Sequence, residues 1–225
     1  MTNPDVLINR SAEAACYVLL RRLAPALKHD MVGAFQPISL MAALLQKRLQ
    51  ATPPDMHLLK ENSVSIKTLS RESAATCLDL MSWLQPLDNE QIDLATGTQE
   101  ALRLVAAELM AKGFDLVNET GSIDREVAKS VLRNVFLASV LALTDQALST
   151  ANVLLTAHMV NDALVLKITL TAQKSEKPYE SYQVYRTIEW SDVQSLAEAE
   201  GAGLQHTDDS VVITFPPKQS SVSTN

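Results

Sequence analysis

Apolar residues in the first part of the chain recur every three or four positions, which is the pattern of amphipathic helices. The pattern is unbroken from Ser11 to about Gln50, and it predicts one long helix that bends near Gly33–Pro37, where a proline removes a backbone donor. Two consecutive prolines in Thr52–Asp55 predict a sharp turn. A second helical stripe then runs to about Gln85, so the two helices are expected to form an antiparallel hairpin.

The apolar stripe of this hairpin continues for about five turns on each arm. Two helices cannot cover such a stripe by themselves, and pairing two copies into a four-helix bundle buries it. The sequence therefore predicts a homodimer. The segment QPLDN at residues 85–89 ends the hairpin and separates a dimerisation domain, residues 1–87, from the rest of the chain.

Beyond this boundary the pattern changes to that of an α+β domain spanning residues 88–217, followed by a polar tail, residues 218–225, that is expected to be disordered. A turn at Val160–Asp162 joins two alternating strands, and Ser191 and Asp192 are expected to cap the last helix. The predicted helices cover residues 96–112, 124–150 and 191–200. The predicted strands cover residues 114–118, 152–159, 163–171, 179–189, 203–206 and 210–215.

Composition narrows the possible partners and compartments. The chain carries 19 Lys and Arg against 26 Asp and Glu, a net charge of -7, and it has no basic run, so nucleic acid is not expected as a partner. No apolar stretch precedes Arg10 and none approaches the length of a membrane span, which predicts a cytoplasmic protein without contact to a membrane. Cys16 and Cys77 lack a CxxC spacing and are expected to be reduced core thiols.

Glycine is the most informative residue type in the second half of the chain. There are 6 glycines, and none lies between Ser122 and Glu200. A backbone that approaches phosphate groups closely needs glycine. A glycine-rich nucleotide loop is therefore excluded from that span.

The order of these elements resembles the dimerisation and phosphotransfer domain of sensor histidine kinases, followed by their ATPase-type domain. Residues 27–31, LKHDM, are similar to the H-box of that family. Residues 196–203, LAEAEGAG, leading into VVITFP at residues 211–216, are similar to the last helix and closing hairpin of the ATPase domain. The resemblance covers roughly residues 12–217 and implies a dimeric four-helix bundle followed by a degenerate, ATPase-like α/β sandwich.

The sequence departs from active kinases at the nucleotide site. The resemblance would require a Mg²⁺-holding Asn within residues 124–150 and two glycine-rich loops, but Asn134 lies a turn or more too early and the loops are missing. Pro37 also follows the histidine by eight positions, where the family has about five. A kept H-box with a lost nucleotide site resembles the ChpT-type histidine phosphotransferases. These relay phosphoryl groups between response-regulator receiver domains, which supply Mg²⁺, so no cofactor of its own is expected.

The resemblance assigns the phosphoacceptor role to His29, which helical geometry places away from the apolar stripe. A neighbouring carboxylate, Asp30, is expected to assist by accepting a hydrogen bond from the other ring nitrogen of the imidazole or by taking its proton. Four further residues near this side of the helix are predicted to contact a partner: Arg22, Lys28, Gly33 and Gln36.

Three functions remain open on the sequence. The first is histidine phosphotransfer through His29 in two-component signalling. The second is a non-catalytic pseudokinase scaffold that binds a response regulator or another signalling protein, in which His29 is an ordinary surface residue. The third, an ATP-dependent kinase, conflicts with the distribution of glycine. The other histidines, His57, His158 and His206, have no ligand spacing around them and are expected at the surface without a metal.

Overall fold

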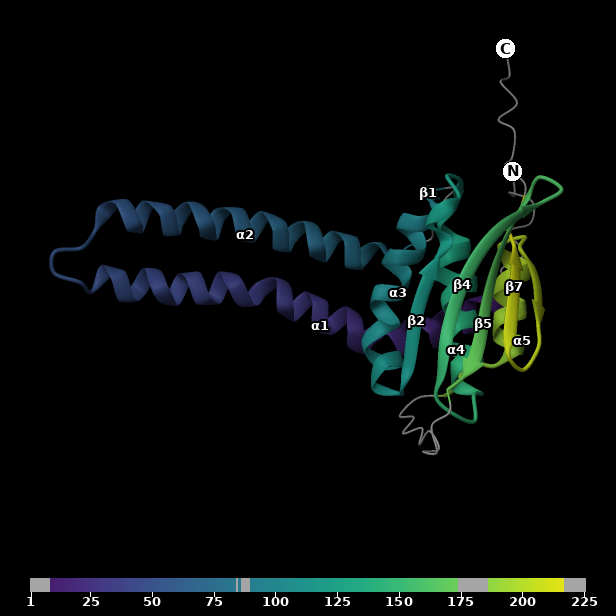
Figure 1. The fold of residues 1–225 in the computed structure, drawn as a ribbon. Coiled ribbons are helices and arrows are strands. Elements are labelled where there is room, and N and C mark those ends of the chain that lie inside the picture. Colours follow the sequence, from purple (N-terminus) through teal and green to yellow (C-terminus); the bar gives the residue numbers. More distant parts are fainter. Residues whose placement is uncertain (1–8, 84, 86–89, 174–185, 217–225) are drawn as a thin grey trace, which may run out of the picture. The chain divides into compact units, whose positions relative to one another are not determined.

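The computed structural model describes residues 9–83, 85, 90–173 and 186–216 (Figure 1). The chain divides into two compact units, Leu23–Pro86 on the one hand and Met1–Arg22 with Leu87–Asn225 on the other. The division departs from the predicted domains in the residues up to Arg22, which belong with the second half of the chain. The first helix therefore contributes to both units.

The hairpin consists of α1 (Arg10–Leu49) and α2 (Met56–Ser82), joined by a short loop. Helix α1 remains helical through Pro25 and Pro37, and α2 ends slightly before the expected Gln85. The Asp55 side chain caps α2 by accepting hydrogen bonds from the backbone N–H groups of His57 and Leu58, at 2.9 and 3.1 Å.

Polar side chains connect the two arms of the hairpin. The hydroxyl of the buried Ser73 donates to the carbonyl oxygen of Ala34 at 2.6 Å. Near the loop, Nη1 of Arg48 donates to Oδ1 of the buried Asn62 at 2.5 Å. These side-chain bonds fix how α1 and α2 face each other, because a buried polar group is costly without its partner.

The α/β unit is built on a five-stranded mixed sheet in the order β2-β4-β5-β7-β6 (Figure 1). Strand β2 runs parallel to β4, and all the other neighbours are antiparallel. The two residues that join β4 and β5, Asn161 and Asp162, have φ values of 48° and 64°, as a tight hairpin turn requires. The strands are β2 (Phe114–Glu119), β4 (Ala151–Val160), β5 (Ala163–Ala172), β6 (Gly203–His206) and β7 (Ser210–Thr214).

Three helices, α3 (Leu94–Ala111), α4 (Leu137–Asp145) and α5 (Trp190–Ala199), pack against one face of this sheet (Figure 1). The strand residues that point toward them are buried, while the alternate residues are partly exposed. The α+β class predicted from the sequence is confirmed. Paired positions across the sheet that form its side of the core include Val153, Leu155, Leu166, Ile168, Val211 and Ile213.

The segment predicted as one helix over residues 124–150 is different in the structure. It begins with β3 (Glu126–Ala128), which pairs with β1 (Gln91–Asp93) in a small antiparallel sheet. A π-helix, η2 (Val131–Phe136), follows it and leads into α4, which ends at Asp145. The prediction was wrong because β3 has only three residues and exists through its pairing with β1, so the sequence carries no strand pattern there.

The remaining differences lie around a short 3₁₀ turn, η1 (Thr120–Ser122), and at the start of α5. The N-cap of α5 is Glu189 and not Ser191, so that part of the prediction is wrong. Asp192 does cap the helix, because its carboxylate accepts a hydrogen bond from the backbone N–H of Glu189 at 3.0 Å in a capping box. Residues 186–189 are not in a strand, and the rest of the predicted strand, like the tail 218–225, lies outside the described residues.

Among the described helices, none is long and apolar enough to cross a membrane.

Candidate functional site

His29 lies on α1, within the hairpin unit, and its side chain is 89% exposed. The carboxylate of Asp30 faces it, with 3.6 Å between Nδ1 of His29 and Oδ1 of Asp30. Asp30 itself is much less exposed, at 26%. An open imidazole beside a half-sheltered carboxylate is an arrangement that a nucleophilic histidine can use.

The separation of 3.6 Å is slightly longer than a hydrogen bond, and a small side-chain rotation closes it. In the tautomer that carries its proton on Nδ1, the imidazole donates to Asp30 and leaves Nε2 with its lone pair free. The carboxylate thus selects which nitrogen is the nucleophile. It also offers a place for the proton that the ring must lose once Nε2 forms a bond.

Three of the predicted partner-binding residues surround His29 on the open surface: Lys28, Gly33 and Gln36 are all exposed. A Cβ added at Gly33, one turn after His29, would meet no atom within 4 Å, so the helix surface is open at that point. The surface of α1 is therefore open to a partner at Gly33, one turn after the imidazole.

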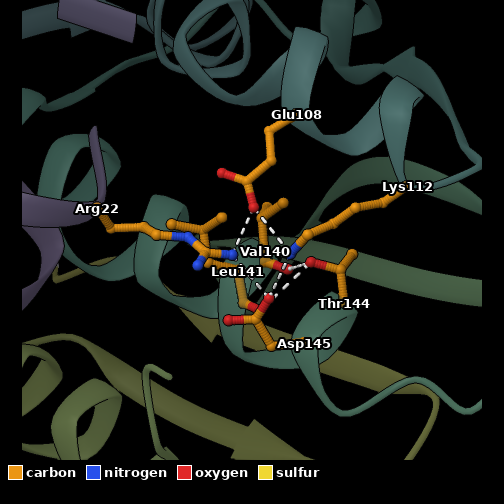
Figure 2. A network of polar contacts seen from close by, with 7 residues as sticks. All are labelled: Arg22, Glu108, Lys112, Val140, Leu141, Thr144 and Asp145. Atoms are coloured by element: carbon orange, nitrogen blue, oxygen red, sulfur yellow. Dashed lines mark hydrogen bonds and ion pairs between the residues drawn. The ribbon is translucent and has the colours of Figure 1, made fainter. Parts of the chain in front are cut away.

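Arg22 does not share this exposure, which corrects the expectation that it contributes to a partner surface. Its side chain is 6% exposed, and its Nη2 donates to Glu108 of α3 and to Oδ1 of Asp145 at 2.9 Å (Figure 2). Helical geometry placed Arg22 and His29 on the same side of α1, seven residues apart. That side is covered at Arg22 by the α/β unit, to which this end of the helix belongs.

A second histidine–carboxylate pair exists at the start of α2, and the sequence reasoning did not identify it. Nδ1 of His57 lies 3.6 Å from Oε1 of Glu61, and the His57 side chain is 80% exposed. Their spacing of four residues on a helix was the signal that could have revealed it. The local geometry of His29 is therefore not unique in the chain, and His57 is a natural internal control.

The helix that would carry a Mg²⁺-binding Asn offers no such residue at its surface. Asn134 lies in the π-helix, where its Nδ2 donates to Oε1 of Glu200 at 2.7 Å. Every residue from Leu137 to Thr144 in α4 is buried. Among the described residues, no group of three or more His, Cys, Asp or Glu is placed to hold a metal ion.

Comparison with known proteins gives matches among solved structures alone. No protein-family model matches the chain, and no curated protein matches it. The solved structures to which it is similar include the histidine kinase AdeS of Acinetobacter baumannii, at 15% identity and a TM-score of 0.46, covering 80% of this chain and 96% of that one. A bacterial phosphotransferase has 14% identity and a TM-score of 0.40, and the match covers 96% of this chain and 100% of the other.

A histidine kinase from Burkholderia phymatum is similar at 15% identity and a TM-score of 0.42, with coverage of 86% of this chain and 96% of that one. These proteins are histidine kinases and a phosphotransferase, the class that the sequence resembles. Similarity of this degree carries no activity, substrate or partner over to this chain.

Proposed function

We propose that the protein is a histidine phosphotransferase of two-component signalling, which relays phosphoryl groups to or from receiver domains through His29 without binding ATP. The observation that carries the proposal is the 89% exposed imidazole with the Asp30 carboxylate 3.6 Å from its Nδ1, within a segment similar to an H-box. A scaffold that only binds a signalling protein would not require His29 and Asp30 to be paired in this way.

The chemistry requires little of the protein besides a positioned nucleophile. The Nε2 lone pair of His29 attacks the phosphorus of an aspartyl phosphate on the receiver. The N–P bond forms as the P–O bond to the receiver aspartate breaks, and that aspartate leaves as a carboxylate. Asp30 takes the proton from Nδ1, so the imidazole ring of the product is neutral and the negative charge stays on the phosphoryl oxygens. The receiver brings the Mg²⁺ that neutralises the phosphoryl oxygens.

Exposed residues around His29 are suited to the docking of such a receiver. The open surface at Gly33 leaves room for a helix of the partner close to the imidazole. The exposed Lys28 supplies a positive charge next to the group that is transferred, and Gln36 supplies hydrogen-bonding groups two turns after His29.

The proposal includes a dimer, because the hairpin leaves large apolar side chains uncovered. On α1, Met31 is 41% exposed, Phe35 is 47% exposed and Leu49 is 59% exposed. Their spacings of four and fourteen residues place them on one stripe of the helix, on the side opposite His29. A second copy that covers this stripe in a four-helix bundle leaves both His29 side chains accessible.

The test is phosphoryl transfer from a panel of acetyl-phosphate-charged receiver domains to the full-length protein. Wild type is compared with His29→Ala and with His57→Ala, which removes the other exposed histidine with a carboxylate neighbour. We expect acid-labile, base-stable phosphate on wild type and His57→Ala, and none on His29→Ala. Label that persists in His29→Ala would contradict the assignment. Binding of a receiver without any label would favour the scaffold function.

A further inference from the structure

A cluster of four charged side chains connects the start of α1 to two helices of the α/β unit (Figure 2). Nη2 of Arg22 donates to Oε1 of Glu108 and, at 2.9 Å, to Oδ1 of Asp145. Nζ of Lys112 lies 2.8 Å from each of the same two oxygens. Two positive and two negative groups thus share one site, which is buried at Arg22 and Asp145 and partly open at Glu108, and their formal charges cancel. We call this cluster the Arg22 latch.

Apolar contacts continue the attachment along the beginning of α1. Ala12, Ala15 and Leu19 are only 8%, 1% and 2% exposed, and their spacing of three and four residues places them on one stripe. The Cys16 thiol lies on the same segment. Burial first, and then the negative charges of Glu200 and Glu13, raise its pKa. Because Glu200 follows directly after α5, the segment Arg10–Arg22 runs close to α5 as well as to α3 and α4.

This attachment explains a feature of α4 that the sheet alone does not. Every residue of α4 from Leu137 to Thr144 is buried, although a helix that lies on a sheet has one side turned away from it. Asp145, at the end of α4, contacts Arg22, and its side chain is 1% exposed. The segment Arg10–Arg22 therefore covers the side of the helical layer that faces away from the sheet.

We propose that Arg10–Arg22 acts as a fourth helix of the α/β unit, and that the Arg22 latch holds it there. Release of Arg22 takes a positive charge away from two carboxylates, and because the Asp145 side chain is 1% exposed, the loss of this partner opposes detachment.

The latch is tested with Arg22→Met in the full-length protein, which keeps the length of the side chain and removes its charge. We expect hydrogen-exchange protection of residues 10–22 and of α4 to fall by about a hundredfold or more, as for a buried ion pair that loses one partner. Alkylation of Cys16 should accelerate as its pKa falls and its thiol opens, while Cys77 on α2 reacts at an unchanged rate. Arg21→Met, at the exposed neighbouring position, is the matched control.

Two rescue variants separate a role of the charge from a role in packing. Arg22→Lys is expected to keep the protection, because Nη2 makes both hydrogen bonds and Nε has no partner among the described residues. The double variant Arg22→Met with Asp145→Asn leaves Lys112 and Glu108 as a balanced pair, and it should recover protection relative to Arg22→Met alone. If Arg22 acted only through packing, the losses of protection caused by the two substitutions would add.

Unchanged exchange and unchanged Cys16 reactivity in Arg22→Met would overturn the proposal. If Arg22→Met does not fold, the proposal is tested with Arg22→Lys and with the double variant. Loss of hydrogen-exchange protection of residues 10–22 in both of these variants would also overturn the proposal. Neither readout involves a phosphoryl group. A failure of phosphotransfer at His29 is thus distinguished from a failure of the latch.

Discussion

Two histidines of this chain have almost the same immediate surroundings, and the comparison shows what distinguishes a candidate nucleophile. His29 and His57 are 89% and 80% exposed, each with a carboxylate oxygen 3.6 Å from Nδ1. The carboxylates differ, because Asp30 is 26% exposed and Glu61 is 58% exposed. A more sheltered carboxylate interacts more strongly with the imidazole, since water screens it less.

We predict that Asp30→Asn slows phosphoryl transfer to His29 by about a hundredfold, the low end of the contribution of a positioned base. The amide still accepts a hydrogen bond from Nδ1 but does not take its proton. Single-turnover transfer from a charged receiver measures the rate. Glu61→Gln is the matched control, and an equal rate for Asp30→Asn and wild type would remove Asp30 from the mechanism.

Residue-level reasoning from the sequence located His29 correctly on the helix surface but not Arg22. The positions are two turns apart, so periodicity assigns them to the same side. The groups that bury Arg22, Glu108 and Asp145, are 86 and 123 residues away in the chain. Contacts of that separation depend on the tertiary fold, which helical periodicity does not contain.

Among the elements, α3 begins with a cap whose strength depends on pH. The Asp93 carboxylate accepts from the backbone N–H and from the hydroxyl of Thr96, both at 2.8 Å. The hydrogen bond from the Thr96 backbone is the largest cause that lowers the pKa of Asp93 below its ordinary value of 3.8. A lowered pKa in the folded state means that the ionised carboxylate is the form that stabilises the fold.

The stabilising contribution of Asp93 is therefore complete above its unfolded pKa and is lost as pH falls through the lower folded pKa. We predict that the free energy of unfolding decreases more steeply for wild type than for Asp93→Asn between about pH 5 and about pH 2. The asparagine still accepts the capping bonds and does not titrate. Urea unfolding at a series of pH values measures the free energy of unfolding of both proteins. Parallel pH dependences for wild type and Asp93→Asn would contradict the prediction.

Elements were predictable where the sequence changes its periodicity or carries turn chemistry. The alternation in β4 and β5 and the turn at Asn161 and Asp162 identified that hairpin to within a residue. Strands β1 and β3 were missed because each has three residues and exists through its partner, as in the pairing of Ile92 with Val127. A strand that short has no pattern of its own.

For the whole molecule, burial of the apolar stripe on α1 requires two copies of the hairpin. We predict that Phe35→Glu converts a dimer to a monomer, because a charge enters the apolar stripe that the second copy covers. Leu40→Glu is the control, since Leu40 is 67% exposed and lies about 140° around the helix from Phe35. Light scattering after gel filtration gives the molar mass, and a dimer that survives Phe35→Glu would place the interface elsewhere.

Phosphotransfer through His29 is tested by locating the phosphoryl group on the protein. The full-length protein is incubated with a phosphorylated receiver and digested at alkaline pH, and the phosphopeptides are mapped by mass spectrometry. Phosphotransfer through His29 predicts a phosphohistidine at that residue, with His57 unmodified in the same sample. A phosphoryl group on His57, or none in a panel that covers the receivers of the same genome, would contradict it.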